Sequence, residues 1–215
     1  MKKVSLLVAS SLLTLAICSQ AAVFQTVTAT GNPSTNGWSL SGSGGEFTTG
    51  GGDWAIFGNG GHQATRSFGN LLAGESVSID LATLGIASGD FVGVDFQDGT
   101  TTGIGFNFQG GGTNYNVFDN SGANATSVGY TSSFQTITLT NVNNTNYTLS
   151  IGATEITSLN LANSTTAIDT IRVFNETSGS GNDVAFNNFN VVPEPGTFAL
   201  IAGLLGFCYV ATRRR

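Results

Sequence analysis

The strongest constraint on the fold is a two-residue alternation of apolar and polar side chains that recurs along most of the chain. Three apolar side chains alternate with glycine and asparagine in residues 104–108, and the same period recurs in residues 137–139, 147–151, 171–173 and 184–186. Successive side chains of a strand point to opposite faces of a sheet, so this period is typical of antiparallel strands with one buried face. Between the two ends of the chain, no segment shows a helical period.

Short runs rich in glycine and asparagine separate the alternating segments, at residues 97–99, 109–112, 120–122, 143–144 and 178–181. Turn signals at this close spacing are typical of all-β domains. A composition with 30 glycines would also fit disorder, but a disordered segment has no face to bury. The sequence therefore predicts an all-β fold, an antiparallel jelly-roll-like β-sandwich.

The first residues form a segment of a different kind. Two lysines precede an uncharged apolar run that ends at Ile17, and Ser19–Ala21 offers small residues at a cleavage site. This arrangement is typical of a secretory signal peptide that forms an N-terminal signal helix. We expect signal peptidase and the secretion machinery to act on residues 1–21, so that the exported chain begins at Ala22.

The exported part has no cysteine and few basic side chains. Both cysteines lie in the terminal segments, so residues 22–190 are predicted to form one domain without a disulfide. Between residues 22 and 192 only Arg66 and Arg172 are basic, and the 13 acids of the chain less Glu194 leave 12, a formal net charge of 2 − 12 = −10. This balance argues against a nucleic-acid partner, because phosphate binding needs clustered lysine and arginine.

The last segment, residues 191–215, opens on a stiff tripeptide, Pro193, Glu194 and Pro195. Each proline fixes its own φ and keeps the preceding residue out of the helical region. A processing enzyme can therefore bind this tripeptide as an extended strand at little cost in ordering entropy.

An uncharged span, residues 196–212, follows the tripeptide and precedes Arg213, Arg214 and Arg215. As a helix the span would be about 25 Å long, which nearly crosses a bilayer core. The arginines are then a stop-transfer cluster that stays on the cytoplasmic side. A buried helix in a soluble domain is the alternative, but it leaves the three arginines without a role, so we expect a transmembrane helix.

The succession of a proline-glutamate-proline motif, an apolar span and a terminal arginine cluster resembles the PEP-CTERM sorting signal of Gram-negative bacteria. In that family the signal is recognised by an exosortase, a membrane enzyme that resembles sortase in its logic. The resemblance implies that an exosortase is a partner and that the inner membrane holds the protein transiently. It also implies delivery of the domain to the cell surface or the extracellular matrix.

The segments "DWAIFGNGGHQATRSF", "GIGFNFQGGGTNYNVFD" and "IDTIRVFNETSGSGNDVAFNNFNV" together resemble exported bacterial β-sandwich domains that often precede such sorting signals. They are also loosely similar to carbohydrate-binding jelly rolls. This second resemblance implies a fold more firmly than a ligand, because its motifs are strand and turn patterns without a catalytic signature.

Four acidic residues are candidate calcium ligands, because hard cations take carboxylate and carbonyl oxygens from acidic turns. We expect Asp95 to act with Asp98, or Asp169 with Asp183, although no spacing defines a calcium loop. Solvated turn carboxylates are the alternative. Asp95 and Asp98 would also be the acids of a glycosidase if they faced each other across a cleft.

Aromatic residues among glycine and asparagine are candidates for stacking on a sugar face. Trp38 and Tyr115 are the preferred ligand contacts, whereas Trp54 is expected in the core because Ile56 follows it at period two. His62, the only histidine, is expected in a solvated loop between glycines.

These observations lead to one preferred function and two alternatives. The preferred function is that of a non-enzymatic exported protein that binds carbohydrate in an exopolysaccharide or biofilm matrix. A structural or adhesive matrix protein is the second hypothesis, and a polysaccharide-degrading glycosidase is the third.

Overall fold

The computed structural model describes residues 25–176 and 183–192 of the chain. These residues form thirteen strands and one 3-10 helix: β1 Gln25–Val27, η1 Pro33–Asn36, β2 Ser39–Thr48, β3 Trp54–Ser67, β4 Ser76–Leu84, β5 Phe91–Asp98, β6 Thr101–Gln109, β7 Asn114–Asp119, β8 Gly122–Gly129, β9 Gln135–Asn141, β10 Tyr147–Ile151, β11 Thr154–Leu159, β12 Thr170–Glu176 and β13 Asp183–Val192. The predicted all-β class is confirmed. The expected signal helix and transmembrane helix both lie outside the described residues, among which no helix is long and apolar enough to cross a membrane.

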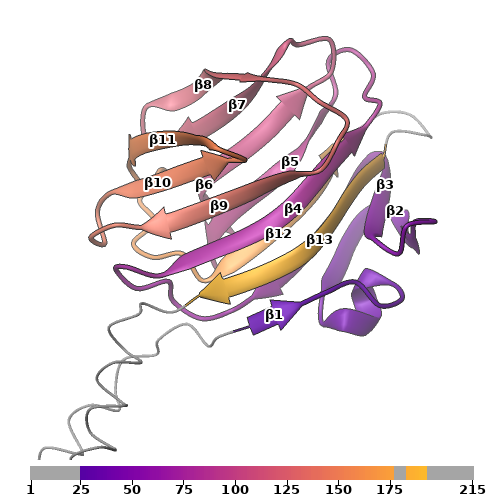
Figure 1. The fold of residues 1–215 in the computed structure, drawn as a ribbon, viewed down its shortest axis with the longest axis horizontal. Helices are drawn as coiled ribbons and strands as arrows, with labels where there is room; N and C mark the ends of the chain where they lie inside the picture. The colour runs from indigo at the N-terminus through magenta and orange to yellow at the C-terminus, as the bar shows by residue number, and fades with distance from the viewer. Residues whose placement is uncertain (1–24, 177–182, 193–215) are drawn as a thin grey trace, which may run out of the picture.

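All thirteen strands belong to one antiparallel sheet that folds over into two layers (Figure 1). The first layer has the order β11-β10-β9-β4-β13, and the second has the order β12-β5-β6-β7-β8. β3 pairs with both β13 and β12, so the layers are joined along this edge. β8 and β11 stand at the two ends of the order, so the opposite edge of the sandwich is open. The predicted antiparallel β-sandwich is therefore confirmed.

β3 serves both layers because it bends at glycines. Its first four residues pair with β13 and its last six pair with β12. Between these parts, Gly60 and Gly61 have φ values of 96° and 107°, which only glycine adopts readily. β2 follows the bend, with a register shift between Gly42 and Gly44. The glycine-rich run Ser41–Gly45 therefore lies inside a paired strand.

Both ends of the described chain leave the sandwich side by side. Gln25 of β1 pairs with Val191 of β13, and Val191 also pairs with Val77 of β4. Val191 is fully buried. The domain therefore extends two residues beyond the expected boundary at Asn190, to Val192.

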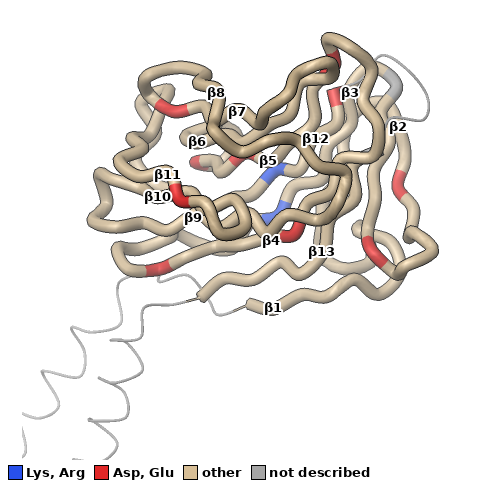
Figure 2. Tube along the Cα trace, turned by 45° about the horizontal axis from the view of Figure 1, so that its top comes forward, with Lys and Arg blue, Asp and Glu red and all other residues tan. Residues whose placement is uncertain are grey.

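Charged side chains are few and mostly acidic. Within the described residues the basic side chains are Arg66 and Arg172, and acids are spread over both layers (Figure 2). Arg66 donates from Nη1 to the carbonyl oxygen of Asn36 at 2.5 Å, and its guanidinium lies 5.3 Å from the centre of the Phe189 ring. Arg66 thus supports the fold, which leaves Arg172 as the basic side chain to consider for binding.

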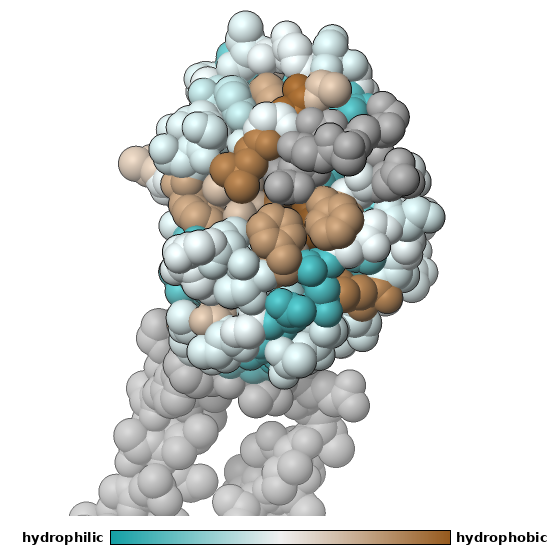
Figure 3. Space-filling model, turned by 90° about the vertical axis from the view of Figure 1, so that its right-hand side faces the viewer, coloured by the Kyte–Doolittle hydropathy of each residue, from teal (hydrophilic) through white to brown (hydrophobic). Residues whose placement is uncertain are grey.

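Exposed large apolar side chains gather at the end of the sandwich where β13 begins, away from the chain ends. Phe57, Leu84, Phe91 and Phe134 are each 36 to 41% exposed. Phe57 and Leu84 flank the first residue of β13 in the strand register. Figure 3 faces this side of the molecule and shows an apolar patch surrounded by polar surface. We call these four residues the apolar end.

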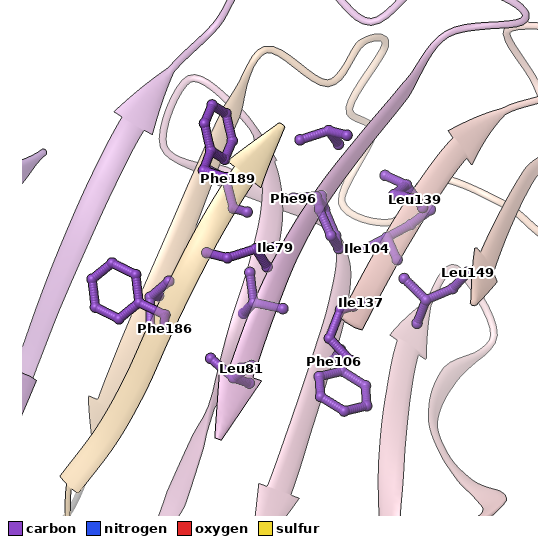
Figure 4. Close-up of a cluster of buried hydrophobic side chains, with 14 of the residues drawn as sticks. Ile79, Leu81, Phe96, Ile104, Phe106, Ile137, Leu139, Leu149, Phe186 and Phe189 are labelled. Carbon is purple, nitrogen blue, oxygen red and sulfur yellow. The ribbon is translucent and has the colours of Figure 1, made fainter. Parts of the chain in front are cut away.

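The space between the two layers is filled by large apolar side chains from both of them (Figure 4). Ile79 and Ile137 enter it from the first layer, and Ile104 and Phe106 from the second, each at most 1% exposed. Trp54 is fully buried there, as expected. The alternation in the sequence thus predicted correctly which residues face the core.

Candidate functional site

The outer face of the second layer is built from the residues that alternate with the core positions. Val94 and Phe96 of β5 are fully buried in the core, so Asp95 between them faces away from it. The strand register places Asp95 beside Arg172 of β12, and Arg172 beside Thr65 of β3. Three strands therefore bring polar side chains together on one face.

This face is hollowed close to the β5–β6 turn, with a cavity volume of about 420 Å³. The strands contribute amide and hydroxyl side chains and one guanidinium: Gln63, Thr65, Ser67, Gln97, Thr170 and Arg172. Thr100 of the β5–β6 turn and Asp169, directly before β12, complete the polar lining. None of the described residues that line it is aromatic. We call this cavity the polar hollow.

The guanidinium of Arg172 is held by three hydrogen bonds. Its Nε and Nη2 both donate to Oδ2 of Asp95, at 3.0 and 2.6 Å, and its Nη1 donates to Oε1 of Gln63 at 3.0 Å. It also lies 4.7 Å from the centre of the Phe174 ring. The side chains of Arg172 and Asp95 are only 22% and 9% exposed. The ion pair therefore holds Arg172 in a fixed position in the lining of the polar hollow.

Burial raises the pKa of Asp95 above its ordinary value of 3.8, because a carboxylate loses hydration there. Arg172 and the hydroxyl of Thr102 oppose this effect, and that hydroxyl donates to Oδ2 at 3.0 Å. Arg172 and Thr102 therefore stabilise the charged form of Asp95.

Further hydrogen bonds fix the polar groups of the hollow before any ligand arrives. The hydroxyls of Ser67 and Thr170 are 3.0 Å apart, and Nε2 of Gln63 donates to the hydroxyl of Ser41 at 2.8 Å. The backbone N–H of Gly99 donates to Oδ1 of Asp169 at 2.8 Å. Hydroxyls and amides both donate and accept, so this lining suits a ligand that carries many hydroxyl groups.

The prediction that Trp38 and Tyr115 contact a ligand is wrong, because both rings lie in the core. Trp38 is 3% exposed and makes an edge contact with Phe186 at 5.0 Å. Tyr115 is 2% exposed, lies 4.9 Å from Phe106, and donates its hydroxyl to the carbonyl oxygen of Thr131. Neither ring offers an open face to a sugar.

The structure does not assemble the expected pairs of carboxylates. Asp95 bonds to Arg172, whereas Oδ2 of Asp98 accepts from the backbone N–H of Thr166 at 3.1 Å. The two acids thus have separate partners, which suits neither a shared calcium ion nor a catalytic pair. Among the described residues, no group of three or more His, Cys, Asp or Glu side chains lies close enough to hold a metal ion.

The second expected calcium pair, Asp169 and Asp183, is also separated. Asp169 directly precedes Thr170, which pairs with Ser67 of β3, whereas Asp183 pairs with Phe57. Phe57 and Ser67 are ten positions apart on β3, about 30 Å of strand at 3.3 Å per residue. Even with the bend in β3, the two acids belong to different ends of the sandwich.

The expectation that His62 lies in a solvated loop is wrong. It lies within β3 and is only 6% exposed. A side chain on Gly44 would come within 2.9 Å of Cγ of His62, so glycine on β2 makes room for the imidazole. The glycines around His62 mark a strand bend and a close approach between strands.

The expected sorting and anchoring residues lie outside the described part of the chain. These are Pro193, Glu194 and Pro195 and the cluster Arg213, Arg214 and Arg215. The structure therefore leaves these expectations as they stand.

Apart from Asp169, which was expected as a calcium ligand, sequence reasoning missed the residues that line the polar hollow, although one signal pointed to them. Arg172 lies between the apolar residues Ile171 and Val173, so the alternation places it on the outer face. It is also one of two basic residues in an acidic domain. Its neighbours Gln63 and Gln97 come from other strands, and only the strand register brings them together.

Neither the protein-family models nor the curated proteins contain a match to this chain. Solved structures do share its fold. A sialidase aligns with a TM-score of 0.64 and 10% identity over 82% of this chain, which spans 19% of the sialidase's length. A carbohydrate esterase of Shiga toxin-encoding bacteriophage phi24B aligns with a TM-score of 0.55 and 16% identity, over 79% of this chain and 100% of the esterase chain.

A third similar structure is the ligand-binding domain of botulinum neurotoxin serotype D in complex with N-acetylneuraminic acid. Its TM-score is 0.53 at 12% identity, over 80% of this chain and 47% of that chain. At such low identities the likeness shows the fold alone. The fold and the site together define this protein as a β-sandwich domain with a polar hollow on one outer face. The structures that share this fold include the sialidase, the carbohydrate esterase and the neurotoxin domain named above.

Proposed function

We propose that this protein binds carbohydrate through the polar hollow and has no catalytic activity of its own. The observation that carries the proposal is the lining of the hollow, where amide and hydroxyl side chains of three adjacent strands converge. The carbohydrate-related names of the structures that share the fold support the same class of ligand. They do not identify the sugar, because fold does not determine function.

The terminal segments supply the second half of the proposal. The signal peptide would export the domain, and the motif at Pro193–Pro195 would present it to an exosortase at the inner membrane. After processing, the domain would act at the cell surface or in an exopolysaccharide or biofilm matrix of a Gram-negative bacterium. The order of the signals along the sequence supports this route.

A structural or adhesive role in the matrix is a second candidate, favoured by the apolar end. Monomeric proteins rarely leave large apolar groups together without a use for them. In this hypothesis the hollow is not needed for function. Loss of carbohydrate binding would then leave matrix attachment unchanged.

The test is glycan binding by residues 22–192, measured on a glycan array and quantified by calorimetry. A double variant, Thr65→Val with Ser67→Ala, removes two hydroxyls from the hollow and changes side-chain volume little. We expect it to weaken binding about thirtyfold, since each of the two lost hydrogen bonds contributes about 1 kcal/mol.

The matched control is Thr138→Val with Ser150→Ala, which removes the same two groups from a cross-strand pair on β9 and β10 of the other layer. This control should bind as the unchanged protein does. Absence of binding to any glycan, or equal losses in both double variants, would contradict the proposed site.

A further inference from the structure

The one cationic group of the polar hollow is already used within the protein. A free arginine recognises a carboxylate through two parallel N–H groups. In Arg172 the Nε and Nη2 groups that form such a fork are both directed at Asp95, and Nη1 is directed at Gln63. Three of the five N–H groups of this guanidinium are therefore bonded, and a carboxylated sugar that approached the other two would lie beside the carboxylate of Asp95.

The charges around the hollow also oppose an anionic ligand. Asp95 lies against Arg172, Asp169 lines the hollow, and Oε1 of Glu176 lies 3.7 Å from Nη2 of Arg172. Two carboxylates thus lie close to the guanidinium, and a third lines the hollow. The other basic residue of the described chain, Arg66, is bonded to Asn36 and Gln25.

The groups that remain for a ligand are uncharged. Thr65 donates its hydroxyl to the carbonyl oxygen of Ser39 at 3.2 Å, and the hydroxyls of Ser67 and Thr170 share one hydrogen bond. Each hydroxyl oxygen can still accept a hydrogen bond, which suits the hydroxyls of a neutral sugar. A carboxylate placed among them would lose hydration without gaining a free cation, and would lie near like charges.

We infer that the polar hollow selects uncharged glycans and excludes carboxylated ones. This inference rests on the proposed carbohydrate function and names its ligand class. It separates this chain from the neurotoxin domain of similar fold, because N-acetylneuraminic acid carries a carboxylate. The selectivity has two sources. The hydroxyl groups of the hollow attract a neutral sugar, whereas its carboxylates repel an anionic sugar that Arg172, already paired with Asp95, does not compensate.

The test uses the full chain in detergent and pairs of polysaccharides that differ only in charge. Each neutral polymer, such as amylose or a β-1,3-glucan, is compared with the same polymer after its primary hydroxyls have been oxidised to carboxylates. We expect at least one neutral polymer to bind, and its oxidised form to bind at least about tenfold more weakly at low salt. The difference should narrow in high salt, because salt screens repulsion.

Asp169→Asn tests the charge argument without removing the turn, because the amide oxygen can still accept from the N–H of Gly99. It should raise the affinity for the oxidised polymer, relative to that for the neutral polymer, about threefold. Glu155→Gln, the same loss of charge on β11 of the other layer, is the control and should change neither.

The outcomes separate the two proposals. Binding of the oxidised polymer as tightly as the neutral one overturns the inference and leaves the carbohydrate function standing. Failure of every polymer to bind, neutral or oxidised, overturns the proposed function and the inference with it. If Asp169→Asn and Glu155→Gln improve binding of the oxidised polymer equally, the overall charge of the protein causes the discrimination between the two polymers. That result would overturn the role of the hollow.

Discussion

At the scale of single residues, the environment of Arg172 and Trp38 decides their roles more than their chemical type does. A tryptophan among polar residues suggested a sugar platform, yet Trp38 contacts Trp54, Phe186 and Phe189 in the core. Arg172 is a lone arginine between two apolar residues, yet it lines the hollow and pairs with Asp95. The sequence contains both residues, but the partners that decide their roles come from distant strands.

The burial of Trp38 leads to a prediction about stability. Trp38→Ala should lower the free energy of unfolding by about 3 to 5 kcal/mol, because it leaves a cavity among packed rings. Urea denaturation of residues 22–192 measures this loss. A change below about 1 kcal/mol would show that the ring is not part of the core.

The Arg172–Asp95 pair leads to a prediction about unpaired charge. Arg172→Met should lower the free energy of unfolding by about 3 kcal/mol at neutral pH, because it leaves a buried carboxylate without its partner. The double variant Arg172→Met with Asp95→Leu should recover most of this loss, since it removes both charges. If urea denaturation shows equal stability for the single and double variants, the pair does not act as a unit.

The Arg172–Asp95 pair also predicts how the stability of the fold depends on pH. The pKa of Asp95 is raised in the folded protein, so between 3.8 and the raised value the folded state binds more protons than the unfolded state. The stability contributed by this group is therefore present at low pH and is lost as the pH rises through that window.

Arg172→Met removes an opposing cause and raises this pKa further. The stability gap between the variant and the unchanged protein should therefore be largest near pH 7 and shrink towards pH 4. Urea midpoints of both proteins across this range measure the gap. A gap independent of pH would contradict the assignment to Asp95.

At the scale of secondary-structure elements, the sequence predicted regular strands well and bent strands poorly. The strict alternation of residues 104–108 fixed β6, because each apolar side chain faces the core. β2 and β3 were obscured by glycines such as Gly42, Gly60 and Gly61, which resemble loop residues when only the sequence is considered. Their role depends on how closely two strands approach each other, and no local pattern contains that information.

Gly42 leads to a prediction about this bend. It has a φ of 99°, and a Cβ there would lie 2.2 Å from the carbonyl oxygen of Gly61. Gly42→Ala should therefore cost at least about 2 kcal/mol of stability, from backbone strain and a clash with backbone.

Gly50→Ala is the control for this change, because a Cβ on Gly50 meets no atom within 4 Å. It should change stability by no more than about 0.5 kcal/mol. Thermal or urea denaturation of both variants decides the matter, and equal effects would show that the bend tolerates side chains.

At the scale of the whole molecule, the two edges of the sandwich differ. Along one edge β3 pairs with strands of both layers, and β2 follows it round the bend. Along the other edge, within the described residues, β8 pairs only with β7, and β11 only with β10. Because the two layers are joined along one edge alone, we expect local unfolding to begin at the other edge, where β8 and β11 lie.

Hydrogen exchange measures this asymmetry. Amides of β8 and β11 should exchange at least about tenfold faster than those of β3 and β12, since free edges open without global unfolding. Mass spectrometry of peptides from residues 122–129 and 154–159, compared with residues 62–67, gives the result. If the amides of all four strands exchange at the same slow rate, β8 and β11 do not open first, and the prediction is wrong.

The pairing of Gln25 with Val191 also has a mechanical consequence. β13 is joined to β4 through eight residue pairs and is held by β1 at its C-terminal end. A pull on the chain beyond Val192 acts along β13, so it shears these hydrogen bonds together rather than breaking them one at a time. An attachment at this end would therefore resist flow or traction while the polar hollow, on the other layer, keeps its shape.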